Sequence, residues 1–196
     1  MRVLVIFCHP NETSFSGALN KAVTESLTGA GHSVTGLDLY AENFNPVMTR
    51  EERIEYEDVP RYVATVKKYA DQLADAEALV AVYPTWWYGL PAMLKGYFDR
   101  VWAPGIAFDI ERDGSVDTNR LGHIRRIGVV TTYGAPWWLI RFYMGDPEHK
   151  LWSRGVRQLC ASGCRLDWLA KYDMDKAPQD SLDRFIARVK RTIGKW

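Results

Sequence analysis

Aromatic side chains gather in one short stretch of the chain, Tyr83-Pro-Thr-Trp-Trp-Tyr-Gly89. An apolar run, Ala78–Tyr83, leads into this stretch, and a helical pattern starts behind it at Pro91. This order predicts a buried strand, a tight turn walled by aromatic rings, and then a helix. Backbone N–H groups and flat apolar faces at one place suit a planar heteroaromatic ring with polar edges, such as the isoalloxazine ring of a flavin. A turn that only packs or makes a dimer contact is the alternative.

Hydroxyl side chains form a second cluster near the N-terminus, between an apolar run, Arg2–Cys8, and an amphipathic stretch, Ala18–Leu27. Thr13, Ser14 and Ser16 lie in the intervening loop, directly before the predicted helix. Their hydroxyls and the free N–H groups of a helix start make an anion site that needs no Lys or Arg. The loop matches neither the G-x-G-x-x-G fingerprint nor a Walker loop. Ordinary helix capping by Ser and Thr is the alternative.

The bulk composition excludes several classes of partner. At 196 residues the chain is expected to be one domain, residues 1–196. The 25 Lys and Arg residues balance the 24 Asp and Glu residues, so we expect no nucleic-acid partner. No apolar run approaches the roughly 18 residues that span a bilayer, so we expect no membrane insertion.

The three cysteines, Cys8, Cys160 and Cys164, do not form a disulfide framework, because their number is odd. Cys160 and Cys164 lack a second pair of ligands for zinc, and we expect no metal site. Buried thiols in a reducing compartment are the favoured interpretation, which predicts a cytoplasmic protein.

Five apolar runs alternate with helical patterns along the chain. The predicted strands are Arg2–Cys8, Ser33–Asp38, Ala78–Tyr83, Arg126–Thr132 and Cys164–Leu169. The predicted helices are Ser16–Ala30, a polar stretch around 49–75, Pro91–Val101, Pro147–Ala161 and Gln179–Ile193. The alternation predicts an α/β fold with a doubly wound five-stranded parallel sheet in the order 2-1-3-4-5.

In that topology ligands bind at the carboxyl ends of the strands, at the switch point between strands 1 and 3. The loop after strand 1 and the aromatic turn after strand 3 both fall on this edge, and a third loop, Thr131-Thr-Tyr-Gly134, follows strand 4. Three independently chosen loops that meet at one crevice favour a ligand with a phosphate and a ring.

Four motifs carry a resemblance to a known family: HPNETSFS from His9, AENFNPVMTREE from Ala41, YPTWWYGLPAMLKGYFDRV from Tyr83 and TTYG from Thr131. The chain resembles the flavodoxin-like NAD(P)H:quinone oxidoreductases, the DT-diaphorase group and its bacterial relatives, from Val3 to about Gly134. The resemblance implies a flavodoxin-like fold, FAD as cofactor with FMN as the alternative, NAD(P)H as co-substrate, and a homodimer with active sites at the subunit interface.

By position, the resemblance also assigns residues to the cofactor. The residues expected to hold the phosphate arm are His9, Thr13, Ser14, Phe15 and Ser16. The residues expected along the isoalloxazine ring are Pro84, Thr85, Trp86, Trp87, Tyr88 and Gly89. The residues expected on the other side of the ring are Thr131, Thr132, Tyr133 and Gly134.

The chain departs from the family at the substrate side. Tyr133 replaces the first glycine of the family's TTGG loop. Its larger side chain is expected to narrow the pocket or to form part of its wall. The Tyr and His that follow this loop in DT-diaphorases have no matching pair here, so no catalytic residue is carried over. Trp137 and Tyr143 are the substrate-pocket candidates in this stretch. Phe108 is a third candidate, in residues 103–125, where Asp113-Gly114 is a hairpin turn signal.

The favoured function is hydride transfer from NAD(P)H through the flavin to a quinone, or to azo or nitro compounds, by a ping-pong mechanism. The alternative is a flavin-binding accessory subunit that regulates a potassium-efflux antiporter. A flavodoxin-type one-electron carrier fits less well, because such carriers are usually strongly acidic and this chain is near neutral.

Overall fold

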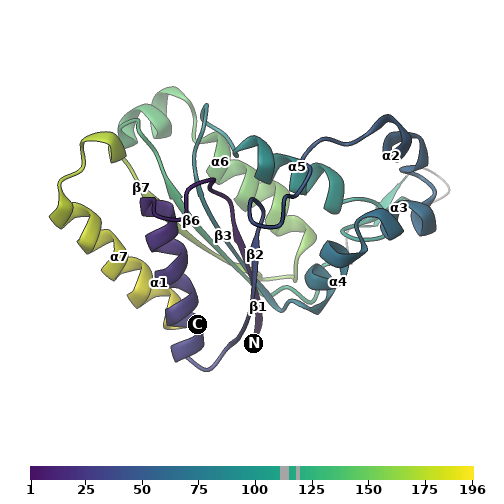
Figure 1. The fold of residues 1–196 in the computed structure, drawn as a ribbon, viewed down its shortest axis with the longest axis horizontal. Helices are drawn as coiled ribbons and strands as arrows, with labels where there is room; N and C mark the ends of the chain where they lie inside the picture. The colour runs from purple at the N-terminus through teal and green to yellow at the C-terminus, as the bar shows by residue number, and fades with distance from the viewer. Residues whose placement is uncertain (111–114, 118–119) are drawn as a thin grey trace.

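The computed structural model describes residues 1–110, 115–117 and 120–196. Five parallel strands form the main sheet, in the spatial order β2-β1-β3-β6-β7 (Figure 1). The strands are β1 (Arg2–Phe7), β2 (Ser33–Asp38), β3 (Ala78–Pro84), β6 (Arg126–Thr132) and β7 (Arg165–Lys171). The flavodoxin-like doubly wound order 2-1-3-4-5 is therefore confirmed.

Helices cover both faces of this sheet (Figure 1). The helices α1 (Phe15–Gly29) and α7 (Gln179–Ile193) pack on one face, and α3 (Val59–Thr65), α4 (Lys67–Asp75) and α5 (Ala92–Val101) pack on the other. Successive side chains of β1 alternate between the two hydrophobic clusters, as the pleat of a strand requires. Within the described residues, each helix is too short or too polar to cross a membrane.

Two predicted helical regions are divided in the structure. The stretch around 49–75 forms α2 (Arg50–Glu55), α3 and α4, and Pro60 begins a new helix because its ring fits only the first turn. The predicted helical stretch Pro147–Ala161 is helical from Pro147 to Leu159, but its geometry changes along the way. The α-helix α6 (Pro147–Lys150) passes into a π-helix, η2 (Leu151–Val156), and then into a short 3-10 helix, η3 (Arg157–Leu159).

A tertiary contact accompanies this change of helical geometry. Trp152 is almost fully buried, and its indole N–H donates a 2.8 Å hydrogen bond to the Tyr83 hydroxyl. Short stretches of π-helix within a helix are rare and occur frequently at functional sites.

A small hairpin lies beside the main sheet. The strands β4 (Asp109–Ile110) and β5 (Val116–Asp117) pair in antiparallel fashion, which agrees with the predicted excursion. The predicted turn itself, at Asp113-Gly114, lies outside the described residues. The remaining turns are η1 (Leu139–Tyr143) and η4 (Met174–Lys176).

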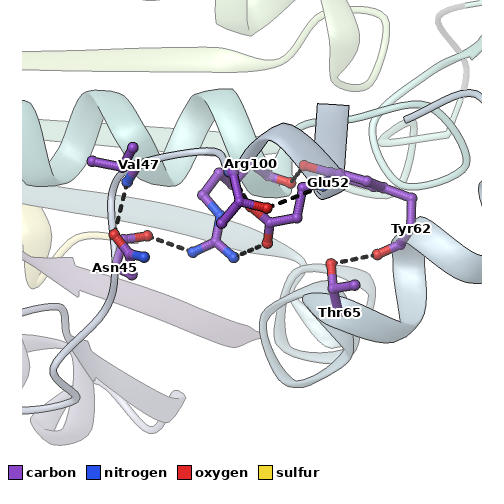
Figure 2. Close-up of polar contacts among 7 residues, drawn as sticks. Asn45, Val47, Glu52, Tyr62, Thr65 and Arg100 are labelled. Atoms are coloured by element: carbon purple, nitrogen blue, oxygen red, sulfur yellow. Dashed lines mark hydrogen bonds and ion pairs between the residues drawn. The ribbon is translucent and has the colours of Figure 1, made fainter. Parts of the chain in front are cut away.

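A buried ion pair fixes the chain between β2 and α3 against α5 (Figure 2). Arg100 binds the carboxylate of Glu52 and the backbone carbonyl of Asn45, and both charged side chains are almost fully buried. The Tyr62 hydroxyl donates a 2.8 Å hydrogen bond to the backbone carbonyl of Arg100. Glu52 also closes the capping box of α2 with Thr49. This one arginine therefore fixes α2 and α3 to α5.

Candidate active site

The three loops that the sequence singles out lie at one edge of the sheet. In β3 and β6, Tyr83 pairs with Thr131 and Pro84 with Thr132, so both strands end together. The Thr85 N–H then donates a 2.8 Å hydrogen bond to the Thr132 carbonyl. On the other side of β3, the loop after β1 comes close, because the ring centroids of His9 and Trp86 are 6.4 Å apart.

The aromatic stretch forms a two-residue turn. The backbone of Trp86 and that of Gly89 exchange two hydrogen bonds of 3.1 Å. Trp87 and Tyr88, at the tip, have positive φ values of 51° and 61°. This is the arrangement of a type I′ turn, which normally uses Asn and Gly at these positions. Holding two aromatic residues in the left-handed region costs about 1–3 kcal/mol each, and such strain is typical of functional sites.

The tip of this turn projects into solvent. The Trp87 side chain is 96% exposed, and the side chains of Trp86 and Tyr88 are partly exposed. Within the part of the chain that the structure describes, the N–H groups of Trp87 and Tyr88 donate no hydrogen bond. The turn thus offers flat apolar faces and free backbone donors in one place, as predicted.

Two adjoining hollows of about 350 and 590 Å³ open between the turn and the loop after β6. Thr85, Trp87, Gly134 and Asp175 line both hollows, which together form what we call the ring cleft. The other lining residues are Pro84, Trp86, Tyr88, Thr132, Tyr133, Ala135, Ile140 and Met174.

Gly134 keeps this cleft open. A Cβ at this position would lie 2.6 Å from a carboxylate oxygen of Asp175. Asp175, Met174, Ala135 and Ile140 were not predicted as site residues. The signal for the first two was available, because Tyr172-Asp173-Met174-Asp175 follows β7 at the same edge of the sheet.

The loop after β1 provides a cradle of backbone donors. Ser14 caps α1, and its hydroxyl accepts a 3.2 Å hydrogen bond from the Gly17 N–H. Thr13 donates from both its N–H and its hydroxyl to the Asn11 side chain. Among the described residues, the N–H groups of Phe15 and Ser16 donate no hydrogen bond and stand at the positive end of the α1 dipole. These donors suit an anion such as a phosphate.

The predicted substrate residues have other surroundings. Trp137 and Tyr143 are exposed on the segment after β6 and do not line the ring cleft. Phe108 packs against the hydrophobic cluster that contains α4 and α5. Tyr133 is nearly fully buried and stacks on Tyr172, with ring centroids 4.9 Å apart.

Beneath the cleft lies a carboxyl group that the sequence analysis missed. Glu148, in α6, is 2% exposed. The Thr85 hydroxyl donates a 2.5 Å hydrogen bond to Glu148 Oε2 and lies 3.0 Å from the Thr131 hydroxyl. Burial raises the pKa of Glu148 above its usual range, and this effect outweighs the opposing influence of the Thr85 hydroxyl and of the hydroxyls of Tyr133 and Tyr83.

Comparisons with known proteins identify the family to which this fold belongs. A family model described as the flavodoxin-like fold matches residues 1–159. The chain is 40% identical to the NAD(P)H oxidoreductase YcaK of Escherichia coli over 108 residues, which are 55% of this chain and 55% of that protein. The chain thus spans about half the length of that relative.

Two further relatives match over longer stretches. The mouse ribosyldihydronicotinamide dehydrogenase (quinone) is 31% identical over 178 residues, covering 81% of this chain and 76% of the relative. The structure of an NAD(P)H:quinone oxidoreductase from Methanothermobacter marburgensis superposes with a TM-score of 0.81 and 25% identity, covering 100% of this chain and 96% of that one. The chain therefore belongs to the flavodoxin-like family that contains the NAD(P)H:quinone oxidoreductases.

Proposed function

We propose that this protein is a flavin-dependent NAD(P)H:quinone oxidoreductase, organised as a single flavin-binding domain over residues 1–196. The observation that carries the proposal is the ring cleft. Three features lie together at one edge of the sheet: the aromatic turn, the loop that contains Gly134, and the loop after β1 with its unpaired N–H groups. The oxidoreductase names of the relatives favour this function over a regulatory accessory subunit.

The residues around the cleft fit a flavin. The free N–H groups of Phe15 and Ser16, with the hydroxyls of Thr13 and Ser14, are suited to the phosphate arm. His9 lies between this cradle and the aromatic turn, where it can contact both parts of the ligand.

The ring would lie between the two walls of the cleft. Trp86, Trp87 and Tyr88 form one wall, with Pro84, Thr85 and Gly89 as the frame of the turn. Thr131, Thr132, Tyr133 and Gly134 belong to the other side. FAD is the expected form and FMN the alternative.

When bound, the flavin supplies the hydride chemistry, because it accepts two electrons from a nicotinamide and passes them to a second substrate. The chain's own residues bind and orient the reactants. The N–H groups of the turn and of the loop after β6 can stabilise negative charge at the ring edge. The exposed side of the cleft admits one flat substrate at a time, which predicts that NAD(P)H and the quinone use it in succession.

We further propose a cytoplasmic homodimer that acts on quinones and on azo or nitro compounds. Exposed aromatic side chains support the dimer, since Trp137, Trp138, Phe142 and Tyr143 form an apolar surface near the cleft. In such a dimer Trp137 and Tyr143 would contribute to the substrate side, and Phe108 remains a candidate for the substrate pocket. The three free, buried cysteines support a reducing compartment.

A direct test is the oxidation of NADH and NADPH by the purified protein, supplied with flavin, in the presence of menadione. Quinone-dependent turnover is the expected result. Protein that binds flavin but shows no turnover with menadione, azo dyes or nitro compounds would contradict the assignment.

A further inference from the structure

Glu148 is a carboxyl group that the mechanism above does not use. It differs from two other buried acids, Glu52 and Asp146, which form ion pairs with Arg100 and Arg141. Within the residues that the structure describes, Glu148 forms no ion pair, and the groups that face its carboxyl are neutral hydroxyls of Thr85, Tyr133 and Tyr83. A buried carboxylate without a cation is costly, whereas a neutral carboxylic acid is tolerated. The surroundings of Glu148 therefore favour the protonated form.

A hydroxyl connects this carboxyl to the ring cleft. The Thr85 side chain touches Glu148 Oε2 at 2.5 Å and also lines both hollows of the cleft. When Glu148 is ionised, Thr85 must direct its only hydroxyl proton toward the carboxylate. When Glu148 is protonated, it can donate to Thr85, and the Thr85 proton is then free for Thr131 or for a group in the cleft.

We propose that Glu148 supplies a proton to the substrate in the ring cleft through the Thr85 hydroxyl. This inference rests on the proposed quinone reduction. Reduction of a quinone to a hydroquinone takes up two electrons and two protons. NAD(P)H provides both electrons and one proton as hydride, so the second proton has to come from an acid or from water.

The transfer of a proton from Glu148 through Thr85 to the quinone needs no further reactant besides solvent. The O–H bond of Glu148 breaks as Thr85 Oγ1 takes its proton, and the O–H bond of Thr85 breaks as its own proton passes to the quinone oxygen. The carboxylate left on Glu148 then takes a proton from solvent, and no electrons move along this route. Thr85 is the residue that meets the substrate, and Glu148 acts through it as a positioning residue.

Groups on several elements set the charge around Glu148. The titratable and charged neighbours are Tyr83, Tyr133, Tyr172, Asp146, Arg141 and His149. Arg141 and His149 approach Asp146 at 2.5 and 3.8 Å and do not pair with Glu148. Tyr83 and Tyr133 are buried, and burial raises the pKa of both hydroxyls, so they stay neutral beside the carboxyl. Glu148 is thus the acid of this cluster that is in direct hydrogen-bond contact with Thr85.

Flavin reduction by NAD(P)H and flavin reoxidation by menadione can be measured separately, and we expect only the reoxidation to need the proton from Glu148. In Glu148→Gln, bleaching of the flavin by NAD(P)H needs no extra proton and is expected to keep its rate. Reoxidation by menadione is expected to slow at least about tenfold, because general acids contribute about 10²–10⁴-fold, and to lose its dependence on pH. Glu25→Gln, an exposed carboxyl on α1, is the control and should leave both steps unchanged.

The rate of menadione reoxidation in variants of Thr85 tests the same proton route independently, even if Glu148→Gln does not fold. Thr85→Val removes the hydroxyl at constant shape and should slow menadione reoxidation as Glu148→Gln does, whereas Thr85→Ser should keep most of the rate. Equal reoxidation rates in Thr85→Val and wild type would overturn the proposal.

A readout on the flavin-free protein completes the test. The carbon-13 NMR signal of the Glu148 carboxyl, identified by its loss in Glu148→Gln, should titrate above the signals of exposed glutamates. A signal that titrates with the exposed glutamates would overturn the relay. Wild-type protein whose flavin is not bleached by NAD(P)H would instead contradict the proposed function, so the two failures are distinguishable.

Discussion

The Thr85 hydroxyl donates a 2.5 Å hydrogen bond to the buried carboxyl of Glu148. The two residues are far apart in the chain, and the end of β3 and the short helix α6 bring them together beneath the ring cleft. The exposed aromatic turn, which we propose binds the ligand, is thus connected to a buried group that can hold a proton.

The free energy of unfolding should depend on pH through Glu148. Below the ordinary glutamate pKa of about 4.3 the carboxyl is neutral in both the folded and the unfolded chain. Above it the unfolded chain releases the proton while the folded chain retains it, so wild type loses stability until the pH passes the raised folded pKa. Glu148→Gln lacks this loss, so its stability relative to wild type should rise with pH across that window. Urea unfolding of flavin-free protein at several pH values measures it, and a difference independent of pH would contradict the assignment.

Trp87→Ala should weaken flavin binding without destabilising the fold, since the indole is almost fully exposed. Aromatic contact contributes about 0.5–1.5 kcal/mol beyond area burial, so the dissociation constant should rise several-fold or more. Flavin fluorescence titration and urea unfolding provide the two measurements. Ile54→Ala, an exposed apolar residue of α2 outside the cleft lining, is the control. Normal flavin affinity in Trp87→Ala would place the ring away from this turn.

Gly134→Ala should partly close the ring cleft. The added methyl group meets the Asp175 carboxylate, which is exposed and can swing aside, so the folding free energy should change by less than about 1 kcal/mol. Flavin affinity should fall more than tenfold, because the methyl group and the displaced carboxylate occupy the space for the ring. Gly29→Ala, which meets no atom within 4 Å, is the control. Unchanged affinity in Gly134→Ala would mean that the ring does not contact this loop.

Arg100→Met should be strongly destabilising. It leaves the Glu52 carboxylate buried without its cation, which typically costs about 3–5 kcal/mol. The exposed pair between Lys67 and Asp71 provides the comparison, and Lys67→Met should cost less than about 1 kcal/mol. Chemical denaturation of the two variants side by side decides this. A small effect of Arg100→Met would mean that α2 and α3 are held to α5 by apolar packing alone.

Steady-state kinetics should be ping-pong with NAD(P)H and menadione. Both substrates need the same exposed side of the ring cleft, so they cannot be bound productively together. Double-reciprocal plots at several fixed menadione concentrations should give parallel lines. Intersecting lines would point to separate binding sites.

Much of the architecture follows from local patterns. β2, β6 and α7 begin and end at the predicted residues. In α7 the apolar periodicity is unbroken, and Phe185, Val189 and Ile193 form one buried face. The segment 147–161 shows the limit of this reasoning. Its helical pattern is real, but the π-helix that begins at Leu151 coincides with the contact of Trp152 with Tyr83, a residue distant in the chain.

The candidate site also contains residues that local sequence patterns reveal and one residue that only the tertiary packing reveals. Its aromatic turn and hydroxyl-rich loop are contiguous in the chain, so their chemistry could be predicted from the residues alone. Glu148 could not be found in this way, since an acidic residue beside His149 and Lys150 resembles an ordinary solvated charge. Only the packing of α6 against Thr85 makes it a buried acid.

The identity of the bound cofactor tests the central claim most directly. Purified protein should be yellow, and denaturation should release a compound whose mass is that of FAD or, as the alternative, FMN. Colourless protein that takes up neither flavin when it is supplied in excess would contradict the account of the ring cleft and of the function built on it.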